Sequence, residues 1–153
     1  MKATRSTSDL TDHLGYWLRY VSNHVSQAFA RKVETQGVTV AEWVLLRQLL
    51  DEKALAPSRV AERMGMTKGA ITKLADRLIA KSLVLRTDDP EDGRAQTLAL
   101  TAKARRLVPE LAALADANDA EFFGSLPPKD RAALLRILKE IVAARGLKSL
   151  PVE

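Results

Sequence analysis

Apolar residues recur at helical spacing in two neighbouring segments near the middle of the chain. Pro57 fits the first turn of a helix, because the N–H that it lacks is not needed there. Gly65 is placed to end that helix in the left-handed conformation, and Thr67 is a suitable N-cap for a second helix. The apolar stripe of the second helix consists of Ile71, Leu74, Ala75 and Leu78. Two short helices joined by such a turn match the helix-turn-helix pattern, although any small helical pair has a similar stripe.

A β-hairpin pattern follows directly. Residues 83–87 (LVLRT) are β-prone, and residues 88–94 (DDPEDGR) are dense in turn formers. Residues 95–100 (AQTLAL) are apolar at alternate positions near their end. Turn formation and solubility explain the acids, but the turn also ends in Gly93 and Arg94. A cation on a loop beside a helix-turn-helix is suited to the adjacent minor groove of DNA, where the potential is strongly negative.

An amphipathic helix is expected on the N-terminal side of this unit, beginning at a cap on Ser8 and ending before Gly37. Its apolar stripe, which includes Trp17, is longer than a small monomeric core usually requires. A shorter helix should follow from a capping box, in which Thr39 and Glu42 exchange hydrogen bonds.

Two further helices are expected on the C-terminal side. Thr101 is placed to cap a helix that reaches about Phe123, and Pro109 inside that helix should kink it. The Pro127–Pro128 pair separates it from a last helix over residues 128–145, which also has a leucine-rich face. The helices at the two ends of the chain therefore need a partner surface. Either they pack on each other or they interlock with a second subunit.

Composition narrows the function classes. A chain of 153 residues is long enough for one domain with a substantial core. It contains no Cys, which excludes disulfides, thiolate zinc sites and thiol-based peroxide sensing. The apolar runs are much shorter than a bilayer span, and the first residues lack the apolar segment of a signal peptide. We therefore expect a soluble, cytoplasmic protein without a membrane partner.

The net charge of +5 is unevenly distributed along the chain. Residues 59–106 contain 11 Lys and Arg against 6 Asp and Glu, whereas the rest of the chain contains 13 of each class. The whole cationic excess therefore lies in the half that has the helix-turn-helix pattern. This distribution is typical of a protein that binds nucleic acid through that half.

No arrangement of residues in the sequence indicates catalysis. The two histidines, His13 and His24, share a predicted helix face but are about 16 Å apart along its axis, too far to hold one metal ion. The segment KGAITK lacks the glycine pattern of a phosphate-binding loop. No Ser/His/acid or paired-carboxylate arrangement stands out. We therefore expect no enzyme activity, no metal and no cofactor.

Two stretches resemble the winged helix-turn-helix domain of the MarR (multiple antibiotic resistance regulator) family of transcription factors. They are VAERMGMTKGAITKLADRLIAKSLVLR and DPEDGRAQTLALT, the second with the wing-tip pattern Asp-x-Arg at Asp92 and Arg94. With the flanking helices, the resemblance covers nearly the whole chain. It implies a mainly α fold with a small β-hairpin wing. The expected parts are a single domain over 1–153, a winged helix-turn-helix over 39–101, and dimerisation helices over 8–36 and 102–146.

The resemblance also implies a sequence-specific transcriptional regulator, a repressor rather than an activator, that binds a palindromic operator in double-stranded DNA as a homodimer. The residues expected at the DNA are Ser58 and Arg59 at phosphates, Lys68, Thr72, Lys73 and Arg77 in the major groove, Arg86 and Arg94 in the wing, and Asp92, which would orient Arg94. The family usually has Arg where this chain has Lys73, and a Lys ammonium does not make the bidentate contact of a guanidinium. The alternative function is a winged-helix module that binds proteins without specific DNA binding.

Proteins of this family often bind phenolic or aromatic acids between the dimerisation helices and the DNA-binding part. The corresponding candidates in this chain are Tyr16, Tyr20, Trp43 and Arg47, with Arg19 as a second carboxylate partner. A structural interpretation competes with this one, because Trp17 and Trp43 both lie on apolar stripes and the tyrosines can line an interface. We favour the structural interpretation for Trp17, which we expect in the core, and leave both open for the other aromatic residues.

Overall fold

Helices follow one another along most of the chain and are interrupted by a β-hairpin. The structure, a computed structural model, describes residues 6–88, 91 and 95–148. Its elements are the 3₁₀ helix η1 (Leu10–Asp12), α1 (Leu14–Glu34), α2 (Val40–Leu49), α3 (Pro57–Met64), α4 (Lys68–Ala80), β1 (Val84–Asp88), β2 (Gln96–Leu100), α5 (Ala102–Phe123) and α6 (Pro128–Arg145). The mainly α fold with a small hairpin, as the sequence predicts, is confirmed.

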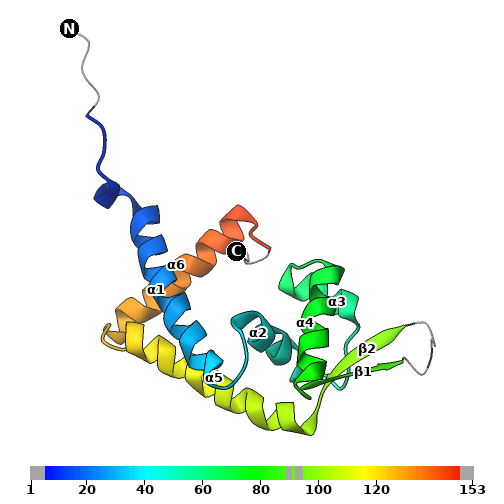
Figure 1. The fold of residues 1–153 in the computed structure, drawn as a ribbon. Coiled ribbons are helices and arrows are strands. Elements are labelled where there is room, and N and C mark those ends of the chain that lie inside the picture. The colour runs from blue at the N-terminus through cyan, green and yellow to red at the C-terminus, as the bar shows by residue number, and fades with distance from the viewer. Residues whose placement is uncertain (1–5, 89–90, 92–94, 149–153) are drawn as a thin grey trace.

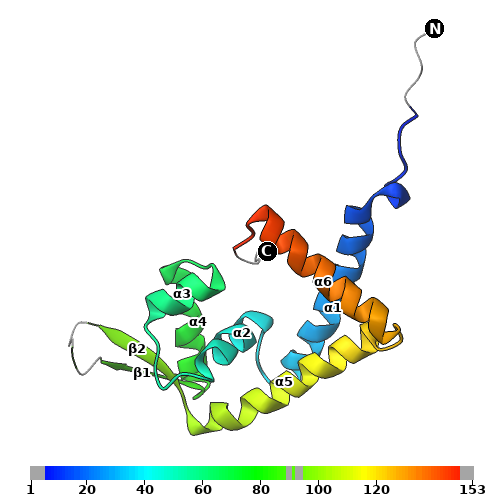
Figure 2. The ribbon, with the colours of Figure 1, turned by 180° about the vertical axis from the view of Figure 1, so that it is seen from behind.

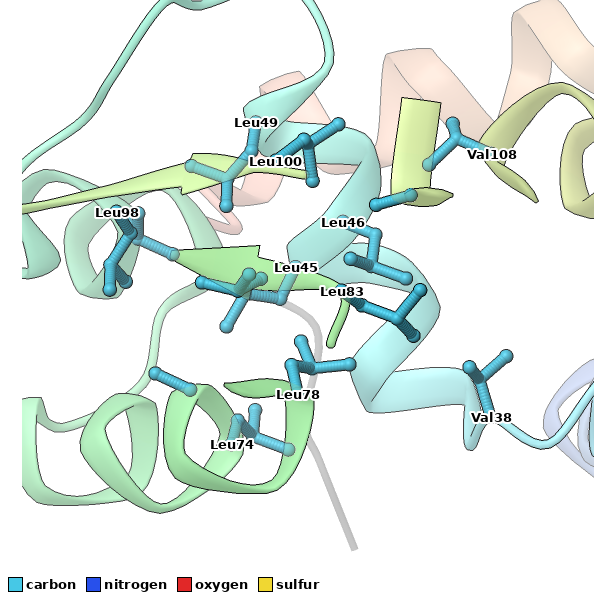
Figure 3. Packing of buried hydrophobic residues seen from close by; sticks show 14 of the residues in the cluster. Val38, Leu45, Leu46, Leu49, Leu74, Leu78, Leu83, Leu98, Leu100 and Val108 are labelled. Carbon is cyan, nitrogen blue, oxygen red and sulfur yellow. The ribbon is translucent and has the colours of Figure 1, made fainter. Parts of the chain in front are cut away.

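The core lies where α2, α4 and β2 meet (Figure 3). Leu45, Leu46 and Leu49 of α2 are fully buried. They belong to one hydrophobic cluster with Leu78 of α4 and Leu98 of β2. Burial of each such side chain contributes about 1.5–3 kcal/mol. The helix α2 therefore holds α4 and the hairpin together.

The turn between α3 and α4 has the geometry that the sequence predicts. Gly65 has φ +64° and ψ +31°, its N–H donates to the carbonyl of Glu62 at 3.3 Å, and the N–H of Met66 donates to that of Ala61 at 3.0 Å. The hydroxyl of Thr67 accepts a hydrogen bond of 3.1 Å from the N–H of Ala70. These two caps satisfy backbone groups that the helix ends leave open, and so they fix where α3 ends and α4 begins.

The hairpin is antiparallel, and Val84 lies opposite Leu100 at its base. A third segment joins it, because Leu55 in the loop between α2 and α3 exchanges two backbone hydrogen bonds with Leu98, of 2.9 and 2.8 Å. The base of the hairpin is therefore fixed to the helix-turn-helix on both sides, through α4 and through this loop.

The N-terminal helix begins later than predicted. Ser8 does not cap it, since α1 begins after His13 and is preceded by the separate turn η1. In that turn the N–H of Asp9 donates to the carboxylate of Asp12 at 2.9 Å. This local bond competes with a continuous helix, which is why Asp is unfavourable within helices and favoured at their starts. His13 therefore does not share a helix with His24, and its ring lies 3.3 Å from the hydroxyl of Ser8.

The capping box at the start of α2 is half formed. The Thr39 hydroxyl accepts a hydrogen bond of 3.1 Å from the N–H of Glu42, as predicted. The Glu42 carboxylate, however, is only 1% exposed and binds the ammonium of Lys81 at 2.7 Å. A buried carboxylate is costly unless a cation pairs with it, so the tertiary partner prevails over the local one.

The long helix α5 connects the hairpin to α1 and α6 at the other end of the molecule (Figures 1 and 2). Thr101 caps it through its hydroxyl and Pro109 lies inside it, both as predicted. Asn118 of α5 is 3% exposed and donates a hydrogen bond of 3.1 Å to the carbonyl of Val25 on α1. The ammonium of Lys32 donates to the same Asn118 at 2.9 Å. These bonds attach α1 to α5.

The terminal helices leave apolar surface exposed. None of the residues of α6 is buried, and its exposed apolar side chains are Leu134, Leu135, Ile137, Leu138, Ile141 and Val142. The first half of α1 is similar, with Leu14 88% exposed. The prediction that Trp17 belongs to the core is wrong, because this side chain is 48% exposed on that part of α1. No helix in the described chain is long and apolar enough to cross a bilayer.

Candidate DNA-binding surface

The helix α4 has a buried face and an exposed polar face. Its predicted stripe, Ile71, Leu74, Ala75 and Leu78, is buried. The predicted groove-facing residues, Lys68, Thr72, Lys73 and Arg77, are all exposed. Among the described residues, no ion pair involves any of the three cations in this second group. Cations without acidic partners on one helix face are available to phosphates and to guanine edges.

Ser58 and Arg59 lie in the first turn of α3, and both are exposed. The helix α3 packs beside α4. Arg59 forms no ion pair with any residue that the structure describes. Pro57 in this turn has no N–H, and the N–H of Arg59 donates to the carbonyl of Ala56 at 3.0 Å, so the attraction for an anion comes from the Arg59 guanidinium and the positive end of the helix dipole. This turn is therefore suited to a phosphate next to the groove that α4 would enter.

Arg86 has a partner that the sequence did not reveal. Its guanidinium lies 2.8 Å from the carboxylate of Asp76, so β1 is joined to α4. The Arg86 side chain is 28% exposed and that of Asp76 is 59% exposed. Beside the pair lies a small hollow lined by Pro57, Ile71, Thr72, Ala75, Arg86, Gln96 and Leu98. A DNA contact by Arg86 stays a prediction, but its side chain is already held by α4.

Several other cations of the basic half are engaged within the protein. Arg63 pairs with Glu52 at 3.0 Å, and Lys81 pairs with the buried Glu42. Arg105 donates to the backbone carbonyl of Glu52, just after the end of α2. Part of the positive charge in residues 59–106 therefore stabilises the fold. The cations of α4 and of the first turn of α3 remain for an external anion.

The sequence also predicts a DNA contact at the tip of the wing. Asp92 and Arg94, predicted as the residues of the minor-groove contact, lie outside the described residues. The strands that lead to them are described, and they extend away from α2 and α5 beside α3 and α4 (Figure 1). The roles of both residues stay predictions from the sequence.

The aromatic residues predicted at an effector site fall into two groups. The first is a series of ring contacts along α1, with centroid distances of 5.1–6.3 Å, formed by Tyr16, Trp17, Tyr20 and His24. In the second, Trp43 is half-buried and meets Phe29 edge-on at 6.4 Å. Phe29 lies about 14 Å beyond Tyr20 along the helix axis. Tyr16 and Tyr20 are therefore not brought together with Trp43 within one chain.

The two candidate carboxylate partners differ in their surroundings. Arg47 follows Trp43 by one turn of α2, but its guanidinium already pairs with Asp51 at 3.0 Å. Arg19 is exposed on the N-terminal half of α1 and has no ion pair among the described residues. A carboxylate ligand beside Trp43 would therefore have to compete with Asp51 for Arg47.

Comparisons with known proteins agree with this geometry. The model of the MarR family matches residues 36–95, which include the helix-turn-helix and most of the wing. The HTH-type transcriptional repressor MdtR of Bacillus subtilis is 33% identical over 97 residues, which are 63% of this chain and 63% of that protein. The match thus spans slightly less than two thirds of the repressor. Residues 36–95 of this chain therefore resemble the MarR family.

Solved structures extend the likeness to almost the whole MarR fold. CouR from Rhodococcus jostii RHA1, solved with bound p-coumaroyl-CoA, has a TM-score of 0.77 at 26% identity, over 96% of this chain and 100% of that one. A mutant of MarR from E. coli, solved with operator DNA, has a TM-score of 0.76 at 22% identity, over 88% of this chain and 99% of that one. The second likeness concerns the fold alone. The curated relatives of this chain are transcriptional repressors and regulators.

Proposed function

We propose that the protein is a homodimeric repressor of the MarR type that binds a palindromic operator and releases it when an aromatic acid binds. In each half-site α4 enters the major groove, the first turn of α3 contacts phosphates, and the wing reaches the minor groove. The observation that carries the proposal is the set of exposed cations Lys68, Lys73 and Arg77 on α4, none of which has an acidic partner in the described chain.

The side chains of α4 favour particular contacts. The hydroxyl of Thr72 donates to the carbonyl of Lys68 at 3.0 Å, which leaves its methyl group to contact a thymine methyl. Arg77 has the planar fork that matches guanine O6 and N7. Lys73 supplies a single flexible ammonium, which suits either a phosphate or guanine O6.

The apolar faces of the terminal helices support a homodimer. On α6, Leu134 and Leu138 are each 37% exposed and Ile141 is 47% exposed. A second copy of the chain would remove these faces from water, and such burial drives association. Two-fold symmetry would then match a palindromic operator, whose half-sites in successive turns of DNA require the two α4 helices to lie about 34–36 Å apart.

Selection of bound fragments from the source genome tests the DNA-binding proposal. We expect enrichment of fragments that share a palindrome. For about 6–10 phosphate contacts, affinity for a selected fragment should fall by about 10³–10⁵-fold between roughly 50 and 200 mM salt. Failure to enrich any sequence, together with a flat salt response, would support the alternative of a protein-binding module.

The effector part of the proposal rests on the surroundings of Trp43. This half-buried indole lies where α2 packs against α1, with Phe29 on one side and Arg47 one turn away. The ligand of CouR, a structural neighbour, is p-coumaroyl-CoA, a CoA thioester of an aromatic acid. An apolar wall with a nearby guanidinium suits an aromatic ring that carries a carboxylate or thioester.

Tryptophan fluorescence can locate the effector, because the chain has two Trp residues. Phenolic acids and their CoA thioesters would be titrated into the wild type and into Trp17→Phe, which keeps only Trp43. Quenching that survives in Trp17→Phe and disappears in Trp43→Phe, with release of DNA, is the expected result. If a broad panel changes neither fluorescence nor DNA binding, the aromatic residues are structural only.

A further inference from the structure

Two helix ends and one helix start meet around the ammonium of Lys81. Lys81 follows the last residue of α4, and its N–H donates to the carbonyl of Arg77 at 3.1 Å, while the N–H of Ser82 donates to that of Ile79 at 2.9 Å. Its side chain reaches the turn between α1 and α2, where it donates to the carbonyl of Gly37 at 2.8 Å. It also donates to both carboxylate oxygens of Glu42 on α2, at 2.7 and 3.1 Å.

Three partners match the three N–H groups of an ammonium, so Lys81 uses its full donor capacity here. The Glu42 carboxylate is only 1% exposed, whereas the Lys81 side chain is 39% exposed. Without Lys81 the buried carboxylate would lose its cation. Each charge of the pair also interacts favourably with a helix dipole. Glu42, an anion, lies in the first turn of α2, and Lys81, a cation, lies at the C-terminal end of α4.

The backbone around Lys81 is held as well. The carbonyl of Lys81 accepts a hydrogen bond of 3.2 Å from the ammonium of Lys103 on α5. The next carbonyl, that of Ser82, accepts from the hydroxyl of Thr101 at 2.8 Å. The end of α4 is therefore fixed to α5 through its backbone and to the junction of α1 and α2 through one side chain.

We propose that Lys81 is a positioning residue for DNA reading, which holds the recognition helix α4 at a fixed place relative to the end of α1. The inference rests on the proposed function. If α1 and α6 form the dimer, the separation of the two α4 helices depends on how firmly each is attached to its own α1. Operator half-sites have a fixed spacing, so a loose attachment costs specific binding more than it costs nonspecific binding.

The first test is the ratio of operator affinity to random-DNA affinity for Lys81→Met. We expect this ratio to fall by about tenfold or more, comparable to the loss of one base contact. The slope of affinity against salt should stay unchanged, because Lys81 binds Glu42 and not a phosphate. Lys53→Met is the matched control, since Lys53 is exposed and forms no ion pair among the described residues. The control should keep the wild-type ratio.

A double variant separates positioning from stability. Glu42→Met with Lys81→Met removes the buried charge together with its partner, and such replacements are often neutral or stabilising. We expect its melting temperature to return toward that of the wild type while the affinity ratio stays low, because the link to the Gly37 carbonyl is still absent. Recovery of the ratio with the melting temperature would overturn the proposal. So would a smaller salt slope with an unchanged ratio in Lys81→Met, since that result would make Lys81 a phosphate contact.

Hydrogen exchange tests the same link without DNA. In Lys81→Met the amides at the end of α4 and those around Gly37 should exchange faster together, while the amides of α3 should be unchanged. A wild type that prefers no DNA sequence would overturn the proposed function. Hydrogen exchange would still show whether Lys81 attaches α4 to the junction of α1 and α2. Unchanged exchange at both helix ends would overturn the positioning role of Lys81.

Discussion

The carboxylate of Asp76 lies 2.8 Å from the guanidinium of Arg86 and thereby joins the recognition helix α4 to the strand β1 of the wing. Asp76 is an acid on the exposed face of α4 that also carries Thr72, Lys73 and Arg77. A free acid there would repel phosphates. Paired with Arg86, it instead links the wing to the helix, and in the proposed complex both elements would approach the duplex as one unit.

Asp76→Ala should weaken operator binding, although it removes a negative charge from the DNA-facing surface. The change in charge alone would raise the affinity, because the phosphates would no longer be repelled by the carboxylate of Asp76. The pair is largely solvated, so stability should change by only about 0–1 kcal/mol. Asp116→Ala, at an exposed position of α5, is the matched control. Tighter operator binding by Asp76→Ala, measured by fluorescence anisotropy, would show that the pair does not position the wing.

Lys73→Ala and Arg77→Ala should each weaken operator binding without affecting the fold, since both side chains are exposed and unpaired in the described chain. A residue that reads a base should cost about 1–3 kcal/mol and relax the preference at one operator position. A phosphate contact should lower the salt slope by about one unit instead. Lys129→Ala on α6 is the control and should bind as the wild type does. Wild-type binding by both α4 variants would place the reading surface elsewhere.

Arg94→Ala tests the wing tip, which lies outside the described residues. Its neighbours Gly93 and Ala95 offer no core for a structural role. The melting temperature and the dimer should therefore be unaffected, while DNA affinity should fall by about 1–3 kcal/mol if the guanidinium enters a groove. Asp92→Ala should show a smaller loss, because it removes only the group expected to orient Arg94. Full operator affinity of Arg94→Ala at physiological salt would exclude the wing from the reading surface.

Leu134→Glu with Leu138→Glu should convert the proposed dimer into a monomer. Both positions lie on the apolar face of α6, and a carboxylate there cannot be buried against a second copy without a large desolvation cost. Sedimentation velocity gives the mass directly, and Lys129→Glu at the exposed start of α6 is the control. A wild type that is already monomeric at micromolar concentration would remove the basis for a palindromic operator.

Ser82→Gly should stabilise the protein. Ser82 is the one described residue other than Gly with positive φ, at +60°, and it sits just after α4. Glycine adopts this conformation without the cost of a Cβ, but it loses more entropy on folding, which leaves a net gain of about 0.5–1 kcal/mol. The melting temperature should rise by about 2–4 °C. Ser125→Gly, at a position without positive φ, should give no rise; equal shifts for both variants would contradict this explanation.

Local rules account for the elements that were predicted correctly. Gly65, Thr67 and Thr101 end or begin helices through hydrogen bonds to residues within four positions, so the sequence alone contains the information. The stripe of α4 was found because its 3.6-residue period is a property of the chain itself. The positions of Lys73 and Arg77 on the opposite face follow from the same period.

Only the tertiary structure decided which partner each polar or amphipathic side chain takes. Glu42 was expected to complete a local capping box, but it binds Lys81, which is 39 positions away. The sequence did not indicate that Arg86, which stays a predicted DNA contact, pairs with Asp76 on the neighbouring helix. Trp17 lies on an apolar stripe that this single chain leaves half exposed. Periodicity and capping depend on neighbours along the chain and can be read from it, whereas ion pairs and burial depend on what folding brings near, which local patterns do not specify.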